Sequence, residues 1–291
     1  MNSKSLSLKM LDALQQGKNR LSGEAQKQIS LFVRSQMTEN GAFMDKNGND
    51  DLYYTSFGLM LAYVFNLNIN TKQTEKWLDK QNDKLSDLLY FAAHVRCQML
   101  CKLLKTGKFN FVLKRFFTTK QKLPAFTDYP HGDQYSPYSQ FLMLTLKEDM
   151  GIETENYQEI ITSLSSYHVE NGGFSNIKGN KTATTNATVA ALAVKGQLSG
   201  YQKNVDVDYL YSLQDDSGGF SATPSAPVPD LLSTATALFM LKCYGVAPRI
   251  NPDNFIDAHW QPSGGFCATL MDENCDVEYT FYGLLALGAS M

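Results

Sequence analysis

The feature that most constrains the fold is a turn followed by an apolar helix, which recurs along the chain. In the clearest copy, Gly218-Gly219-Phe220 is followed by a polar loop that ends at Pro229-Asp230 and opens an apolar stretch. The turn phenylalanines of the recognisable copies stand at positions 43, 174, 220 and 266, so that the last two steps are 46 residues each. A fixed period of this size is typical of repeat architectures.

Each repeat predicts a helical hairpin. Before the turn the pattern is amphipathic, as where Ile29, Phe32 and Val33 alternate with polar residues. After the turn the helix is apolar on nearly every side, as in 284–287, and such a helix is expected to be buried. Units of about 46 residues, roughly six of them, account for most of the 291 residues. No unusually polar end unit is visible, which favours closure into a ring.

The turn and the Asp-led helix after it resemble the repeat of protein prenyltransferase β subunits and of squalene-hopene and other class II terpene cyclases. The resemblance implies an all-α fold, the (α/α)6 toroid (barrel) of six helical hairpin repeats, with inner helices around a central cavity. We expect residues 1–20 to be a polar, loosely packed N-terminal extension and residues 21–291 to form a single α/α toroid domain.

Composition limits the classes of partner and compartment. The formal net charge is −3, which provides no basic field for nucleic acid. No apolar run reaches 18 residues, so we expect no transmembrane helix. The first residues lack the sustained apolar segment of a signal peptide. The 5 cysteines have no framework spacing, which favours a reducing compartment and a cytoplasmic protein.

The loops just before the inner helices are where we expect chemistry. In a toroid of this kind these loops share one rim, and the positive ends of the inner helix dipoles point into it. The fold prediction therefore places five loop residues on one rim: Asp51, Asp133, Lys181, Asp230 and Asp276. The Gly-Gly-Phe turns themselves are interpreted as structural.

The prenyltransferase resemblance implies a zinc site formed by an Asp-x-Cys segment and a His of the next unit. Asp230 matches the Asp, but Leu232 stands at the Cys position and Tyr279 at the His position. We therefore expect no zinc and no other bound metal. His94, Cys97 and Cys101 share one helical face, which allows a metal site or a buried polar spot on a core helix.

The same resemblance implies side chains for a prenyl diphosphate. Lys178 and Lys181 have the spacing of the family's Arg-x-x-Lys pair, and His131-Gly132 with Tyr135-Ser136 resembles its His-Gly and Tyr-Thr segment. These elements lie one or two units before the Asp230 match. Either they form an anion site, which Mg²⁺ could enter together with a diphosphate, or the lysines are solvated loop charges.

The cyclase resemblance implies a different chemistry. Class II cyclases protonate an alkene with the middle Asp of Asp-x-Asp-Asp-Thr. Residues 276–280 keep Asp276 and place Glu278 at the donor position, whereas Asp230 and Asp51 keep only the first carboxylate of their copies. A carboxyl group in an apolar cavity has a raised pKa and can remain a proton donor. The alternative is that Asp276 and Glu278 cap the last helix.

The leading hypothesis is an isoprenoid-handling, cyclase-like enzyme that is acid-initiated and independent of zinc. Its candidate catalytic residues are Glu278, Asp276 and Asp230. A hydrophobic isoprenoid or prenyl diphosphate is expected in the cavity, where aromatic faces can stabilise a carbocation. Substrate-binding candidates are Asp51, Tyr54, His131, Tyr135, Lys178, Lys181, Tyr279 and Tyr282. The alternatives are a prenyltransferase-like protein that binds a prenyl diphosphate and a non-catalytic toroid that holds a lipid or a partner peptide.

Overall fold

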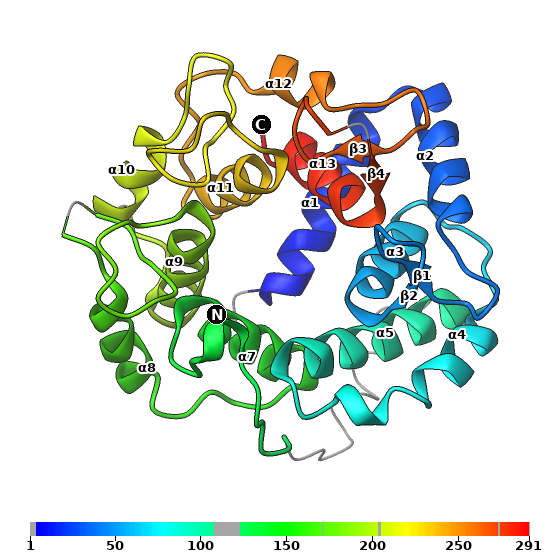
Figure 1. The fold of residues 1–291 in the computed structure, drawn as a ribbon, viewed down its shortest axis with the longest axis horizontal. Helices are drawn as coiled ribbons and strands as arrows, with labels where there is room; N and C mark the ends of the chain where they lie inside the picture. Colours follow the sequence, from blue (N-terminus) through cyan, green and yellow to red (C-terminus); the bar gives the residue numbers. More distant parts are fainter. Residues whose placement is uncertain (1–3, 108–122, 171, 203–204, 273, 291) are drawn as a thin grey trace.

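A computed structural model describes residues 4–107, 123–170, 172–202, 205–272 and 274–290 as a ring of helices (Figure 1). Among these residues, the inner helices are α3 (Leu52–Val64), α5 (Leu88–Thr106), α7 (Pro137–Met150), α9 (Thr185–Ser199), α11 (Leu231–Cys243) and α13 (Val277–Ala289). The outer helices are α2 (Gly23–Ser35), α4 (Thr71–Leu78), α8 (Tyr157–Leu164), α10 (Val205–Ser212) and α12 (Asp253–Ala258). The predicted all-α toroid is confirmed.

The remaining regular elements are short. Strands β1 (Phe43–Met44) and β2 (Asp50–Asp51) pair antiparallel, as do β3 (Phe266–Cys267) and β4 (Cys275–Asp276). The 3₁₀ helices are η1 (Asn82–Lys84), η2 (Pro130–Gly132) and η3 (Ser165–Tyr167). In both strand pairs the turn phenylalanine lies opposite the Asp that precedes the inner helix, Phe43 opposite Asp51 and Phe266 opposite Asp276. The strands thus fix the distance between the turn and the helix start.

The spacing from phenylalanine to threonine has a direct structural cause. The backbone N–H of Phe220 donates to the hydroxyl of Thr234 at 2.8 Å, and the other three copies repeat this bond. All four phenylalanines and all four threonines are buried. The hydroxyl satisfies an N–H that would otherwise be buried without an acceptor. The repeat is therefore maintained by one hydrogen bond per unit and one aromatic ring packed behind it.

Each inner helix begins at a side-chain cap. In every case an oxygen of the cap residue accepts a backbone N–H of the first turn, which satisfies one of the free donors at a helix start. The caps are Asp51, Asp87, Ser136, Thr184, Asp230 and Asp276. The inner helices consequently share a common reference position, and residues at equal offsets from the cap can be compared between units.

The loops before the inner helices are connected around one rim. The first N–H of α11, from Leu231, donates to Ala268 in the loop of the next unit, and Thr185 of α9 donates in the same way to Ala222. Leu88 of α5 donates to Asp128. The ring is closed across its first and last units by Lys46, whose ammonium lies 3.3 Å from Asp272. These bonds place the loops of successive units side by side, as the fold prediction requires.

The N-terminal segment differs from expectation, because it forms a packed helix, α1 (Leu6–Arg20), that crosses the opening of the ring (Figure 1). It packs against α13, α3 and α7, and Leu6 and Leu14 are completely buried. Where α1 meets α13 the backbones nearly touch: a Cβ on Gly288 would lie 1.7 Å from the carbonyl oxygen of Ala13. The expectation of a loosely packed start was wrong, because the contacts of α1 come from distant parts of the chain.

Candidate functional site: the central cavity

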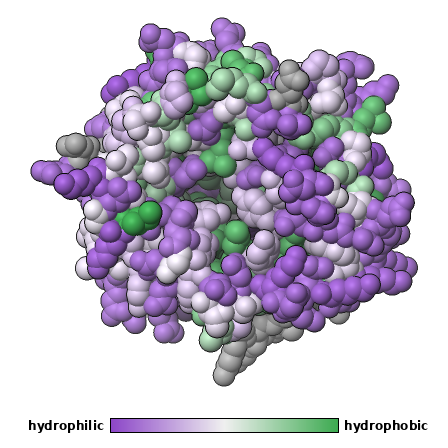
Figure 2. Space-filling view, in the orientation of Figure 1, coloured by the Kyte–Doolittle hydropathy of each residue, from purple (hydrophilic) through white to green (hydrophobic). Residues whose placement is uncertain are grey.

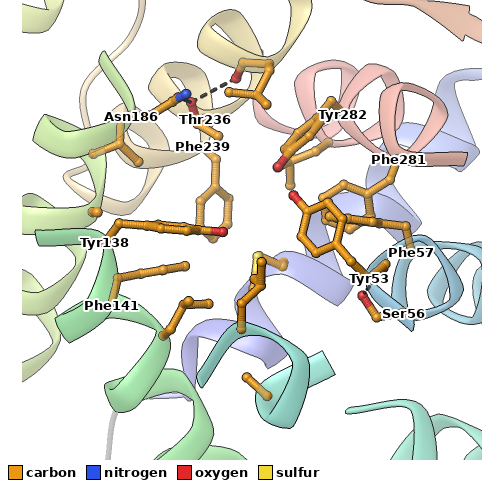
Figure 3. A pocket seen from close by; sticks show the side chains of 18 of the residues that line it. Tyr53, Ser56, Phe57, Tyr138, Phe141, Asn186, Thr236, Phe239, Phe281 and Tyr282 are labelled. Carbon is orange, nitrogen blue, oxygen red and sulfur yellow. Dashed lines mark hydrogen bonds between the residues drawn. The ribbon is translucent and has the colours of Figure 1, made fainter. Parts of the chain in front are cut away.

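The inner helices and α1 enclose a cavity of about 210 Å³. Figure 2 shows a hollow near the middle of one face, with hydrophobic side chains inside it and a largely hydrophilic surface around it. Aromatic side chains project into this space from both sides: Tyr138 and Phe141 from α7, and Tyr53, Phe57, Phe281 and Tyr282 from α3 and α13 (Figure 3). Met10 of α1 also lines it. An apolar cavity with a few polar groups is the usual form of a small-molecule site.

The lining residues occupy fixed offsets from the helix caps. Two residues after the cap come Tyr53, Leu89, Tyr138, Asn186 and Leu232. Five and six residues after it come pairs such as Ser56 with Phe57, Ala92 with Ala93, and Phe281 with Tyr282, and nine residues after it come Met60, Arg96, Phe239 and Leu285. This is the i, i+3, i+4, i+7 pattern of one helix face. Each inner helix therefore presents the same face to the cavity.

Glu278 occupies the second position after its cap, the position that lines the cavity in the other five inner helices. Its side chain does not line the cavity itself, because the residue is 9% exposed and Tyr53 stands before it. The Tyr53 hydroxyl donates to Glu278 Oε1 at 2.8 Å. Burial raises the pKa of Glu278 to about 7, the Tyr53 hydrogen bond opposes the rise, and the charge of Asp276 adds to it. At neutral pH the protonated and ionised forms are then comparably populated.

Tyr53 and Tyr282 link Glu278 to the cavity. Their side chains lie together at the wall that α3 and α13 form (Figure 3). Burial raises the pKa of both hydroxyls well above the ordinary value, so both stay protonated and act as hydrogen-bond donors. Glu278, whose pKa is about 7, is thus connected to the cavity by the hydroxyl group of Tyr53.

Two of the three carboxylates predicted to be catalytic, Asp276 and Asp230, are helix caps, and so is the substrate-binding candidate Asp51. Asp276 Oδ1 accepts the Tyr279 N–H at 2.7 Å, Asp230 Oδ1 accepts the Ser233 N–H at 2.8 Å, and Asp51 accepts in the same way. Asp276 is 2% exposed, and its second oxygen lies 3.8 Å from the ammonium of Lys46. The capping alternative therefore applies to Asp276. Glu278 instead accepts a hydrogen bond from Tyr53 of α3.

Of the candidates for anion binding, His131 lines the cavity, whereas Tyr135, Lys178 and Lys181 do not. Asn176 also lines it, and the side-chain nitrogens of His131 and Asn176 are 3.2 Å apart. Lys178 and Lys181 are exposed on the loop that follows Asn176. Tyr135 is 53% exposed and does not line the cavity. The structure thus brings His131 to the cavity and leaves the two lysines on the open loop beside it.

Tyr54 and Tyr279 stand three residues after their caps and are not among the described residues that line the cavity. The ammonium of Lys46 lies 4.9 Å from the centre of the Tyr279 ring. Burial raises the pKa of both tyrosines, and the charge of Glu278 raises it further. Of the predicted tyrosines, Tyr282 lines the cavity, and the lining residue Tyr53 was not among the candidates.

The residues at the implied zinc position do not fit zinc. Leu232 has no donor atom and faces the cavity, one Asp230 oxygen is engaged in capping α11, and the raised pKa of Tyr279 keeps its hydroxyl neutral. Within the described ranges no three His, Cys, Asp or Glu side chains are grouped to hold a metal ion. His94, Cys97 and Cys101 are buried on α5, and burial raises the pKa of Cys101 to about 12 and lowers that of His94.

These features define a toroid of paired helices around a small, aromatic-lined cavity. The family description "Prenyltransferase alpha-alpha toroid domain" matches residues 4–85, 136–207 and 194–290. The chain belongs to this prenyltransferase α-α toroid family, as the repeat indicated.

Two further comparisons add little to the family assignment. A search of curated proteins gives no match. Among solved structures, the chain is similar to Candida albicans protein geranylgeranyltransferase-I complexed with GGPP, at 16% identity and a TM-score of 0.47, over 97% of this chain and 82% of that chain.

In the part of the chain that the structure describes, no helix has the length and apolar character needed to cross a membrane.

Proposed function

We propose that this protein handles isoprenoids in the manner of a terpene cyclase, without zinc, and that Glu278 is the acid that starts the reaction. The observation that carries the proposal is a buried carboxyl group with a pKa of about 7 at a cavity-facing helix position, hydrogen-bonded to Tyr53. A general acid works best when its pKa lies near the operating pH. The apolar, aromatic wall suits a hydrocarbon and the cation formed from it.

In this mechanism the proton reaches the substrate through Tyr53. When Glu278 is protonated, its hydroxyl donates to the Tyr53 oxygen and the Tyr53 proton turns toward the cavity. The alkene π electrons then form a new C–H bond with that proton, the Tyr53 O–H bond breaks, and Glu278 passes its own proton to the tyrosine oxygen. The substrate becomes a carbocation and Glu278 a carboxylate. Tyr138, Phe57 and Phe281 present ring faces or edges to the same space and support the cation.

Binding of an isoprenoid can be tested by filling the cavity. Ala190 lines it, so the Ala190→Phe side chain should occupy the space that a hydrocarbon needs. We expect calorimetric binding of geraniol and geranyl diphosphate to fall at least tenfold, while the variant stays folded because its new ring enters open volume. The matched control is Ala258→Phe, on the exposed end of an outer helix. Unchanged binding by Ala190→Phe would place the ligand elsewhere.

A prenyl diphosphate is the second candidate ligand, supported by the arrangement at the mouth. His131 and Asn176 lie at the entrance of an apolar cavity, and Lys178 and Lys181 follow on the adjoining loop. A hydrocarbon tail inside would leave the diphosphate near these donors, with Mg²⁺ as a possible companion of the diphosphate. This arrangement serves a binding protein as well as an enzyme.

The lysine pair gives a separate test. Changing both Lys178 and Lys181 to Ala should weaken binding of geranyl diphosphate about threefold to tenfold, because exposed charge pairs contribute about 0.2–1 kcal/mol each. Binding of geraniol, which has no charge, should not change. The control is the double substitution Lys27→Ala and Lys72→Ala on outer helices. Equal diphosphate affinity in both double variants would show that the lysines are only surface charges.

A further inference from the structure

The deep part of the cavity contains a charged group that the proposed reaction does not use. Arg96 stands nine residues after the cap of α5, at the level of Met60, Phe239 and Leu285. Among the described residues that line the cavity, it alone carries a permanent charge. Tyr138 lines the same cavity; burial raises its pKa to about 12, and the charge of Arg96 opposes part of this rise.

One hydrogen-bond donor of the Arg96 guanidinium, Nε, has no acceptor among the described residues. The guanidinium has five N–H donors in all, and Nε is buried. The nearest carboxylate contact joins Nη2 to Asp149 Oδ2 at 3.8 Å, beyond hydrogen-bond distance. Asp149 is itself 6% exposed and accepts the Ser7 hydroxyl of α1 at 3.0 Å. A buried donor without an acceptor is unfavourable, so the Nε group favours a ligand that supplies an acceptor.

We propose that the ligand of this cavity carries a carboxylate that binds Arg96, with its hydrocarbon part against Phe141, Phe239 and Phe281. A guanidinium fork matches a carboxylate in shape and in charge. Arg96 is a single cation and already lies beside the carboxylate of Asp149, so it suits a ligand with one negative charge better than a diphosphate. A diphosphate group is expected at the mouth of the cavity instead. The proposal rests on the proposed function only for the isoprenoid nature of the hydrocarbon.

The size of the cavity limits the ligand. An apolar cavity of about 150 Å³ accommodates benzene. The present volume of about 210 Å³ therefore suits a hydrocarbon of roughly ten carbons or fewer. The proposed ligand is therefore a short isoprenoid monocarboxylic acid. Met10 of α1 forms part of the cavity wall around it.

The test compares geranic acid with its neutral methyl ester at pH 7.5, by calorimetry on the full chain. We expect the acid to bind at least tenfold more tightly, as a charge-assisted hydrogen bond would give. Arg96→Met should remove this preference while the ester keeps its affinity. The matched control is Arg34→Met on outer helix α2, where the guanidinium binds Asn68 and the preference should persist.

A second variant keeps the test decisive if Arg96→Met does not fold. Asp149→Asn removes the competing carboxylate without removing Arg96, so it should strengthen acid binding severalfold and leave ester binding unchanged. Equal affinity for acid and ester in the wild-type protein would overturn the proposal and leave isoprenoid binding intact. An acid preference that survives Arg96→Met would also overturn it. Failure of both compounds to bind would contradict the proposed function as well.

Discussion

The Glu278→Gln protein should fold normally and lose turnover of its isoprenoid substrate by about 10²–10⁴-fold, the usual contribution of a general acid. Gln keeps the shape of Glu and can still accept the Tyr53 hydrogen bond, but it has no proton to give. The measurement is product formation by wild-type and variant proteins under identical conditions. The control is Glu24→Gln, an exposed carboxyl group in the first turn of outer helix α2.

The same substitution should stabilise the protein at high pH. The pKa of Glu278 is raised from 4.5 to about 7, so the folded protein holds this proton more tightly than the unfolded chain. Below pH 4.5 the group is protonated in both states and costs nothing. Between about pH 4.5 and 7 the unfolded chain ionises while the folded protein keeps its proton, which costs the folded state up to about 3 kcal/mol, at about 1.36 kcal/mol per pKa unit, and above pH 7 this cost stays constant.

Melting temperatures measured from pH 4 to 9 check this dependence. Wild-type and Glu278→Gln proteins should melt together near pH 4 and separate by several degrees above pH 8, with the variant the more stable. A constant difference across the range would mean that Glu278 ionises as easily in the folded protein as in the unfolded chain. Full turnover by Glu278→Gln would end the acid mechanism, and a binding-only toroid would then be the better hypothesis.

The Phe266→Ala substitution should be among the most destabilising in the chain, at about 3–5 kcal/mol. The ring is 1% exposed, lies edge-on to Trp260 at 5.2 Å, and fills the space that Gly283 leaves open on α13. Since Phe266 also pairs with Asp276 between β3 and β4, its loss should loosen the cap of α13.

Chemical denaturation followed by circular dichroism gives the free energy of unfolding. The comparison variant is Tyr157→Ala, which removes a ring that is 44% exposed on outer helix α8 and should cost under 1 kcal/mol. A similar, small loss in both variants would show that the repeated phenylalanine is not a structural centre of its unit. Near-normal stability of Phe266→Ala would also undermine the explanation of the repeat given above.

The sequence predicted the ring because its determinants are local and repeated. Phe220, Thr234 and Asp230 lie within 15 positions of one another, and the four clear copies repeat the phenylalanine and the threonine with a capping residue before the helix. The position of α1 could not be predicted in this way. Its determinants are Gly17 on one helix and Gly288 on another, and nothing near either residue identifies the other as its neighbour.

The candidate site was only partly predicted, for a geometrical reason. The prediction favoured the caps, Asp51 and Asp230, because loops at a rim commonly carry function. The cavity, however, is lined at the second, fifth, sixth and ninth positions after each cap, which adds Tyr53 and Arg96. Counting two, five, six and nine residues from each cap would have found Tyr53 and Arg96. The same count also gives Glu278 and Tyr282.

The meeting of α1 with α13 has a consequence for how the protein is made. The hydrogen bond from the Arg20 guanidinium to the Leu287 carbonyl joins residues 267 positions apart. A ribosome adding about 5–20 residues per second needs roughly 15–50 s to cover that interval. Throughout this time the part of α1 that packs against α13 lacks its partner, although α3 and α7 are made before α13. Helix α1 can therefore reach its final packing only after α13 has been made.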